Sequence, residues 1–241
     1  LILQKSDFFE FSKNKGKLRI ENSKDTKIRE QADLIDSDST SCFSLDIFKS
    51  ENIFIQELSL ELKGTVIRGV SKNIILGDPI SENKIGYLEI DNSSDVTVWN
   101  TELNWCKINQ SNEIKLNKTL IKNSKQEEGL LIIESKEIFV DNSNFNISRL
   151  NSISVVNSEK IKITKSSFSG SQLNGISING SCKIIISENT SFENRKNGIE
   201  VLNSSGVRIN GNTLYSNGMF GIFIDKCSDC VSLDGNKFPV S

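Results

Sequence analysis

The feature that most constrains the fold is a short motif that recurs along the whole chain. It reads apolar, polar, apolar, then two or three polar residues, then an apolar or aromatic residue, at intervals of about 23 residues. Its ten copies begin at Ile28, Ile53, Ile74, Val96, Ile114, Ile138, Ile161, Ile184, Val207 and Val231. A further copy at Leu1, Leu3, Ser6 and Phe8 indicates that the sequence begins inside a repeat.

A serine column accompanies the motif. Serine stands three residues before the first apolar residue in nine successive repeats, at Ser50, Ser71, Ser93, Ser111, Ser135, Ser158, Ser181, Ser204 and Ser228. A second apolar pair, such as Ile176 and Ile178, precedes each serine. Apolar residues at every second position predict strands that bury alternate side chains.

Three short strands in about 23 residues cannot bury an apolar face alone, but identical coils stacked on one another can. We therefore predict an all-β parallel β-helix, a solenoid of about ten coils. A leucine-rich repeat solenoid is the competing fold, but it requires leucine where this chain has serine. Uniform composition predicts a single domain over residues 1–241, a fragment that starts and ends within coils and whose open strand edges associate end to end.

Stacking also predicts what fills the columns. We expect the serines to point inward and form a hydroxyl ladder in which each oxygen donates and accepts. A similar amide ladder is expected from Asn189, Asn212 and Asn236. An internal aromatic stack is expected from Phe145, Phe168, Phe192 and Phe238.

Composition excludes several functions. The chain has no histidine, which removes Ser-His-Asp and Cys-His catalysis and histidine zinc sites. A net charge of −2 makes nucleic acid a poor partner, and no apolar run is long enough for a membrane span. The five cysteines are scattered, so we expect core thiols; the Cys227-x-x-Cys230 pair is either redox-active or incidental.

Segments such as 174–178 (NGISI), 197–201 (NGIEV) and 207–212 (VRINGN) resemble the repeats of the pectate-lyase-like superfamily of right-handed parallel β-helices. The resemblance implies a right-handed coil and a site on the outer face of the Gly-Ile-x-Ile strands. Polygalacturonase-like members place aspartates just before that glycine and use a histidine. Here those positions hold Asn174, Asn197 and Phe220, so that subclass is excluded.

The outward positions of the Gly-Ile-x-Ile strands carry charge mainly in the second to fifth coils, at Asp46, Arg68, Glu89, Asp91 and Lys107. Neighbouring coils lie ~4.8 Å apart, so Asp46, Arg68, Glu89 and Lys107 are expected to touch in sequence, although the register at Arg68 is ambiguous. Ordinary cross-strand pairing on a solvated sheet explains the same charges.

Two aromatic residues lie in the same coils. Tyr87 and Trp105 stand six residues before the ladder serine, where later coils have small residues. We expect the rings side by side on the outer face, more than half exposed in a shallow groove and flanked by Glu89 and Lys107. Such a surface suits a sugar, since aromatic faces stack on sugar C–H groups. Packing beneath a long turn is the alternative explanation.

Three functions remain open. The first is a non-catalytic β-helix that binds a glycan or presents a surface, with Tyr87, Trp105, Asp46, Glu89 and Asp91 in the binding site and no cofactor or metal. The second is a polysaccharide lyase or epimerase acting on an acidic polysaccharide, with Arg68, Lys107 or Glu89 as catalytic candidates and calcium as its possible ion. The third is a structural or adhesin stalk. Each implies a secreted, periplasmic or cell-surface location.

Overall fold

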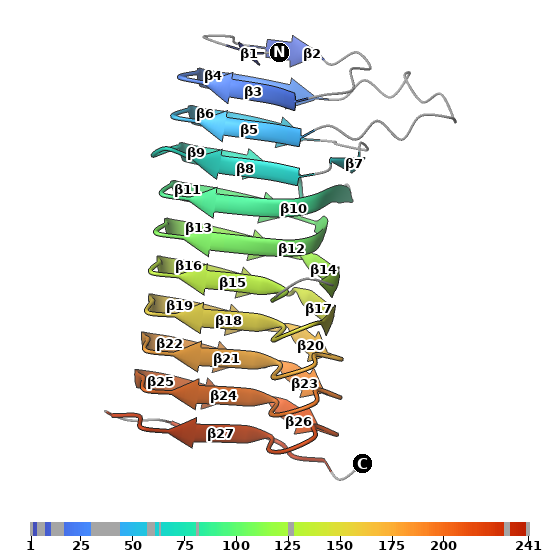
Figure 1. Ribbon diagram of the computed structural model, residues 1–241, viewed down its shortest axis with the longest axis vertical. Coiled ribbons are helices and arrows are strands. Elements are labelled where there is room, and N and C mark those ends of the chain that lie inside the picture. Colours follow the sequence, from blue (N-terminus) through green and yellow to red (C-terminus); the bar gives the residue numbers. More distant parts are fainter. Residues whose placement is uncertain are drawn as a thin grey trace.

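The computed structural model describes residues 2–3, 8–10, 17–29, 44–56, 61–62, 64–80, 82–124, 128–228 and 232–239. The described chain is an all-β parallel solenoid whose coils rise along one axis from the N-terminal to the C-terminal end (Figure 1). All of its strand pairs are parallel, and each strand pairs with its counterpart one coil away. The predicted parallel β-helix is therefore confirmed.

The strands form three faces. The front sheet, which faces the viewer in Figure 1, comprises β1 (Ile2–Leu3), β3 (Lys17–Glu21), β5 (Ser44–Phe48), β8 (Gly64–Arg68), β10 (Asn83–Asp91), β12 (Thr101–Asn109), β15 (Leu130–Ile133), β18 (Ile153–Val156), β21 (Ile176–Asn179), β24 (Ile199–Leu202) and β27 (Ile222–Asp225). The back sheet comprises β2 (Phe8–Glu10), β4 (Lys24–Arg29), β6 (Glu51–Gln56), β9 (Lys72–Leu76), β11 (Ser94–Trp99), β13 (Asn112–Asn117), β16 (Lys136–Asp141), β19 (Glu159–Thr164), β22 (Cys182–Ser187) and β25 (Ser205–Asn210). The side strands are β7 (Glu61–Leu62), β14 (Leu120–Ser124), β17 (Asn144–Ser148), β20 (Ser167–Ser169), β23 (Thr190–Phe192) and β26 (Thr213–Tyr215).

Front and side strands belong to one continuous sheet because β10 and β12 bend through the corner between them. The start of β10 pairs with the side strand β7, and its end pairs with the front strand β8. In the same way, β12 pairs with both β14 and β15. From β14 onward the side and front strands are separate elements, joined by loops.

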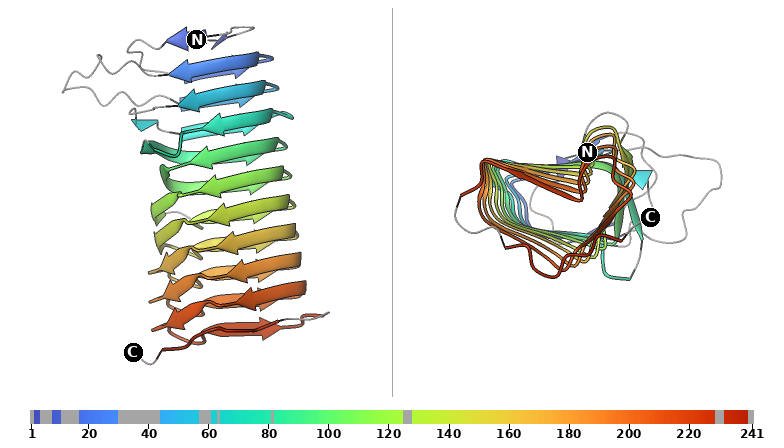
Figure 2. Two further views of the ribbon diagram at one scale, coloured as in Figure 1. Left: turned by 180° about the vertical axis from the view of Figure 1, so that it is seen from behind. Right: turned by 90° about the horizontal axis from the view of Figure 1, so that it is seen from below.

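The core is a set of apolar columns that run parallel to the solenoid axis. The first apolar residues of successive motifs, such as Val96, Ile114, Ile138 and Ile161, pair directly from coil to coil and have no exposed surface. Seen along the axis, the coils superpose around one enclosed interior (Figure 2). Burial of these columns is the main stabilising contribution that a solenoid can make.

About ten coils were predicted, about 23 residues apart. Ten strands stack in the back sheet, and about eight turns have described strands on all three faces, with the predicted spacing. The register of the first repeats differs. Thr26, not Ile28, pairs with Ile53, so a threonine occupies the first position of this motif copy. The motif was defined by an apolar residue at that position, and the sequence therefore predicted Ile28 instead. Leu3 pairs within the front sheet, opposite Ile20, and Leu1 and Val231 lie outside the described residues.

The serine ladder is confirmed in position and corrected in detail. The ladder serines from Ser50 to Ser204 are buried, and Ser23 extends the column by one coil. Most of these hydroxyls accept the backbone N–H of the preceding coil's serine, as in Ser135 N–H to Ser158 Oγ at 3.1 Å, and donate to a carbonyl two residues earlier, as in Ser158 Oγ to Val156 O at 2.8 Å. Ser71 instead donates three residues back, to the Arg68 carbonyl at 2.9 Å. Hydroxyls were expected to bond one another, but the turn backbone supplies their partners.

The asparagine ladder is confirmed, and the aromatic stack is only half correct. Asn189 donates to Asn212 Oδ1 at 3.0 Å, and Asn212 donates to Asn236 Oδ1 at 3.0 Å. Phe145 and Phe168 stack inside the core with ring centroids 5.1 Å apart.

Two phenylalanines expected in that stack lie elsewhere. Phe192 pairs with Ser169, because its coil has one more residue before the aromatic position, and it therefore faces outward. Phe238 is 57% exposed. Single-residue differences in spacing move a strand side chain from the inner to the outer face.

Candidate functional site

The outer face of the front sheet places the predicted charged residues in two neighbouring columns. Asp46 pairs with Val66, Val66 with Glu89, and Glu89 with Lys107. Arg68 lies two residues beyond Val66, opposite Phe48 in the next column. The ambiguous register is thereby resolved: Val66, not Arg68, stands between Asp46 and Glu89, so the predicted unbroken chain of contacts is wrong.

Arg68 nevertheless reaches diagonally to Asp46. Its guanidinium donates two hydrogen bonds to that carboxylate, at 2.9 and 3.1 Å, and Arg19 lies 3.8 Å from the same group. Asp46 is only 1% exposed, so its charge requires such partners. The hydrogen bond to Asp46 raises the pKa of Arg68 above its ordinary value. A guanidinium held in this way is a poor general base, because the base must first lose its proton.

An aromatic residue completes this cluster. Arg19, Lys49 and Arg68 surround the ring of Phe48, with their cationic groups 5.0 to 5.6 Å from its centroid. Cations at these distances are attracted to the ring face. The charged groups and the ring of this cluster thus contact one another.

Tyr87 and Trp105 lie side by side, as predicted. Their ring centroids are 5.1 Å apart and their planes differ by 9°. Both side chains are partly buried, so the prediction that the rings are more than half exposed is wrong. The burial arises because the rings occupy the corner where β10 and β12 bend, rather than the flat face of the sheet.

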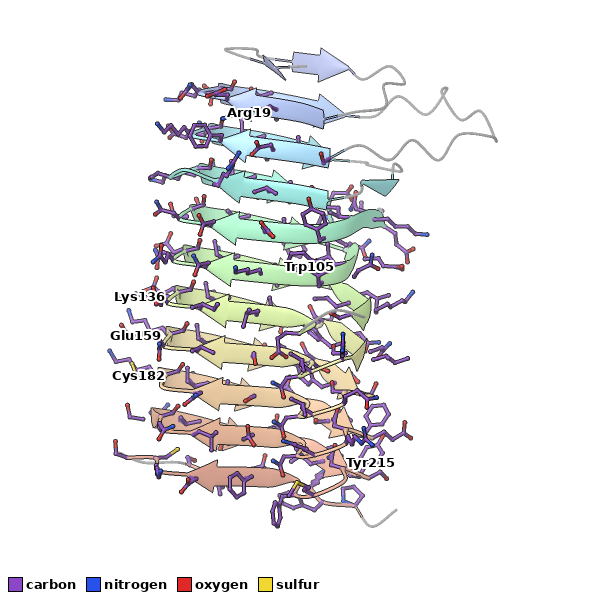
Figure 3. The ribbon with its side chains drawn as sticks, viewed as in Figure 1. Arg19, Trp105, Lys136, Glu159, Cys182 and Tyr215 are labelled. Carbon is purple, nitrogen blue, oxygen red and sulfur yellow. The ribbon has the colours of Figure 1, made fainter. Side chains whose placement is uncertain are left out.

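Glycine residues flank the pair in the neighbouring coils. Gly64 lies one coil before Tyr87, and a Cβ at Gly64 would come within van der Waals overlap of the Tyr87 ring. Gly129 occupies the corresponding place one coil after Trp105 and contributes no side chain there. The second face of Trp105, turned away from Tyr87, is therefore not covered by Gly129. Figure 3 shows Trp105 at the corner end of the front face.

Charged and amide groups continue the surface beside the rings. Glu89 and Lys107 lie opposite each other, two residues beyond Tyr87 and Trp105 on their strands. In the described part of the chain neither residue belongs to an ion pair shorter than 4.0 Å. Asp91 accepts a hydrogen bond from Asn109 at 2.7 Å. Glu89 and Lys107 thus remain available for hydrogen bonds to a ligand.

None of the described cysteines forms a reactive cluster with this surface. Cys106 is fully buried behind Trp105 on β12, and burial raises the pKa of its thiol far above the ordinary value, which makes it unreactive. Cys182 and Cys227 are partly buried. Cys42 and Cys230 lie outside the described residues, so the Cys227-x-x-Cys230 hypothesis stays untested.

A second polar row on the front face was missed by the sequence reasoning. Glu200 accepts hydrogen bonds from Asn174, Asn197 and Ser177, at 3.1 to 3.3 Å. In these coils the outward residue follows the asparagine of the Asn-Gly pair by three positions, as Ser177 follows Asn174. That repeated spacing could have revealed the arrangement.

A similar contact occurs nearer the N-terminal end. Glu128 accepts from Ser154 Oγ at 3.0 Å and from Asn151. Ser154, opposite Leu131 in the front sheet, is only 7% exposed. The row is hydrogen-bonded internally along its length.

The asparagines that replace polygalacturonase aspartates have a structural role. Asn174 and Asn197 are each 3% exposed. Asn174 Oδ1 accepts the Asn197 N–H at 3.0 Å, and Asn197 Oδ1 accepts the Phe220 N–H at 3.2 Å. Their side chains support the loops between side and front strands.

Within the described ranges, no group of three or more His, Cys, Asp or Glu side chains is arranged to hold a metal ion. Among the same residues, no helix is long and apolar enough to cross a membrane.

The fold and its columns define a class of protein, the parallel β-helices, and comparison identifies the family. Residues 107–239, more than half of the chain, match the family described as "Right handed beta helix region". The chain belongs to that family, which confirms the right-handed coil expected from the resemblance. A search of the curated proteins found no match.

Solved structures with the same fold have little sequence identity to this chain. The periplasmic alginate epimerase AlgG superposes with a TM-score of 0.62 at 13% identity, covering 99% of this chain and 76% of that chain. The Dettilon tailspike protein superposes at 0.60 with 11% identity, covering 99% and 55%. Tailspike protein 2 of bacteriophage CBA120, an enzymatically active domain, superposes at 0.54 with 14% identity, covering 99% and 38%. At such identities the likeness shows the fold alone.

Proposed function

We propose that this chain is a non-catalytic, extracytoplasmic β-helix that binds a glycan at the corner formed by β10 and β12. The observation that carries the proposal is the parallel stack of Tyr87 and Trp105, with Glu89 and Lys107 at the next outward positions. Aromatic surface beside hydrogen-bonding charged groups suits a sugar, which has apolar C–H faces and polar hydroxyls.

The geometry favours Trp105 rather than Tyr87 as the residue that contacts the sugar. Tyr87 packs over Gly64 on one side and stacks on Trp105 on the other, so its faces are already occupied. Trp105 has a second face, on the side of Gly129, which has no side chain. A sugar ring is therefore expected to stack on Trp105, with Tyr87 holding the indole in place and Lys107 or Glu89 bonding hydroxyl groups.

The structures that share the fold support a polysaccharide ligand and a location outside the cytoplasm. One is named as a periplasmic alginate epimerase. Two others are named as tailspike proteins, one of them an enzymatically active domain. The absence of histidine and the involvement of Arg68 with Asp46 favour binding over catalysis.

The test begins with a glycan array and continues with titration of the glycans that bind. Replacing both rings, Tyr87→Ala with Trp105→Ala, is expected to raise Kd about five-fold, because the one stacking contact, on Trp105, is worth roughly 1 kcal/mol. The matched control is Phe192→Ala with Tyr215→Ala. That pair is also outward-facing, partly buried and stacked at 5.1 Å.

The outcomes separate a site from packing. Loss of binding in the Tyr87/Trp105 variant alone, with thermal stability close to that of the control variant, supports the site. Unchanged binding in that variant, or no bound glycan on the array, contradicts the proposal.

A catalytic role has one specific observation in its favour. Lys107 lies opposite Glu89 beside the aromatic pair, where a lyase or epimerase would need a base. Assay of uronate polymers with and without calcium, following unsaturated product and epimer content, tests this. Activity that disappears in Lys107→Ala or Glu89→Ala, with the fold intact, would replace the binding proposal by an enzymatic one.

A further inference from the structure

A groove of about 270 Å³ lies near the aromatic pair, where β12 and β14 begin. Its side chains include Glu82, Glu102, Lys118, Lys122, Thr119 and Asn144. On one side Glu82 belongs to the connection between β9 and β10, of which residues 77–80 and 82 are described. Asn100 donates to the Ile80 carbonyl at 3.3 Å and ties this connection to the next coil.

The groove presents donors and acceptors in balance. Lys122 and Glu102 form an ion pair at 2.9 Å and remain 44% and 36% exposed. With Glu82 and Lys118 the formal charges of the lining cancel. A neutral surface of mixed donors and acceptors matches hydroxyl groups, each of which donates and accepts, better than it matches a highly charged ligand.

Thr119 adds an independent observation. It lines the groove and is 1% exposed, and its Oγ1 has no hydrogen-bond partner among the described residues. The equivalent hydroxyls in the neighbouring coils are satisfied: Thr101 donates to the Trp99 carbonyl at 2.7 Å and Ser143 to the Asp141 carbonyl at 2.8 Å. The one unsatisfied hydroxyl of this column segment therefore lies beside the groove, where it marks packing that the folded chain alone leaves incomplete.

The groove and the aromatic pair share a strand. Glu102 lies three residues before Trp105 on β12, a separation of about 10 Å along an extended chain. A short oligosaccharide lying along β12 would reach both. The proposed glycan would then run across the coils, parallel to the strands, rather than along the solenoid axis.

We propose that this groove is a hydrogen-bonding subsite for an uncharged, hydroxyl-rich sugar unit, bound by Glu102 and Lys122. The inference rests on the proposed function for the idea of a glycan ligand, but not on the aromatic pair as its site. The groove extends the contact surface from β12 to β14.

The experiment uses free monosaccharides as probes: glucose, galactose, mannose and N-acetylglucosamine, with galacturonate as the charged comparison. Saturation-transfer NMR with the whole chain is expected to detect at least one neutral sugar. The signal should fall at least five-fold in Glu102→Gln with Lys122→Met. The matched control is Glu137→Gln with Lys160→Met, an ion pair of 2.8 Å with nearly the same exposure on the back sheet.

The variants also separate this inference from the proposed function. A signal that survives Tyr87→Ala with Trp105→Ala but not the groove variant supports the groove even if no array glycan depends on the rings. A glycan that depends on the rings, with no neutral monosaccharide signal sensitive to the groove variant, overturns the groove and leaves the proposed function standing. Equal losses in the groove and control variants also overturn it.

Discussion

The coils around β10 to β13 and those from β15 to β26 turn the same corner in different ways. In the first region, β10 and β12 are single nine-residue strands that bend from the side face to the front, and aromatic rings occupy the bend. In the second, the strands stop and a loop separates them, as between β20 and β21. The repeat is therefore 18 residues from Val96 to Ile114 but 23 from Ile138 to Ile161.

Each way of turning the corner requires different side chains. A loop frees backbone N–H and C=O groups that must find partners, and the buried asparagines and serines of the longer coils provide them. A continuous strand keeps its backbone paired and instead leaves a corner to fill, which Tyr87 and Trp105 do. Regular asparagine ladders thus mark the coils whose corner loops need support, while irregular side chains mark the coils that have room for a ligand.

The largest expected effect concerns the longer coils. Asn212→Ala should lower the free energy of unfolding by about 3 kcal/mol, because it leaves several buried polar groups without partners. Asn212 is 1% exposed; it accepts the Asn189 N–H at 2.9 Å and donates to the Ile186 carbonyl at 2.9 Å. Urea denaturation measures the loss, and Asn179→Ala, at an exposed position of β21, is the control. Similar losses in both variants would show that the ladder is not what holds these loops.

How much of this could be predicted depends on repetition. The serine, asparagine and apolar columns were predictable because nearly identical coils repeat the same environment, so one interpretation is tested many times along the sequence. The fold follows from that repetition alone. The register of Arg68 was not predictable. Gly69 and Val70, both with positive φ, make the turn before Ser71 one residue longer, so counting back from Ser71 gives the wrong position for Arg68.

The candidate site was harder for the same reason. Tyr87 and Trp105 were found because they depart from a column of small residues, but their burial depends on the bend of β10 and β12, which no local pattern encodes. Glu128 was missed because its contacts with Asn151 and Ser154 come from the next coil. Sequence periodicity reveals columns, and exceptions to them, but not the packing at each exception.

The serine ladder runs through both regions, so it tests what they share. Ser158→Ala should cost about 1–2 kcal/mol, since it removes the acceptor of the buried Ser135 N–H. Ser154→Ala should also be destabilising, because the Ser154 hydroxyl donates to Glu128 at 3.0 Å. The neutral control is Ser187→Ala, at an outward position of β22. A cost at Ser187 equal to that at Ser158 would contradict the inward orientation of the ladder.

Acid should affect the longer coils by a smaller amount. The hydrogen bond from Lys160 lowers the pKa of Glu137, and that from Lys183 lowers the pKa of Glu159. Figure 3 shows Lys136, Glu159 and Cys182 in successive coils along the edge of the back sheet. A carboxylate whose pKa is lowered in the fold stabilises it above the unfolded pKa of about 4.3, and this stability is lost as pH falls through the lower folded value.

Melting temperatures between pH 7 and pH 3 measure this effect. The wild type should lose more stability on acidification than Glu137→Gln with Glu159→Gln, and the difference should vanish at the lowest pH, where all the carboxyl groups are protonated. Both groups lie at the surface, so salt should reduce the difference. Parallel pH profiles for the two proteins would show that these ion pairs contribute nothing to the fold.

The smallest expected effect concerns Thr119, between β13 and β14, and it tests the difference between the two regions most directly. Thr119→Val should leave the stability unchanged or slightly raised, because the buried Oγ1 has no partner among the described residues and valine has nearly the same shape. One coil earlier, Thr101→Val should cost about 1 kcal/mol, since that hydroxyl donates to the Trp99 carbonyl at 2.7 Å. Parallel urea denaturation of the two variants compares the same chemical change at adjacent positions of one column. If Thr119→Val costs as much as Thr101→Val, its hydroxyl has a structural partner in the folded chain, and the groove loses the feature that sets it apart from the ladders.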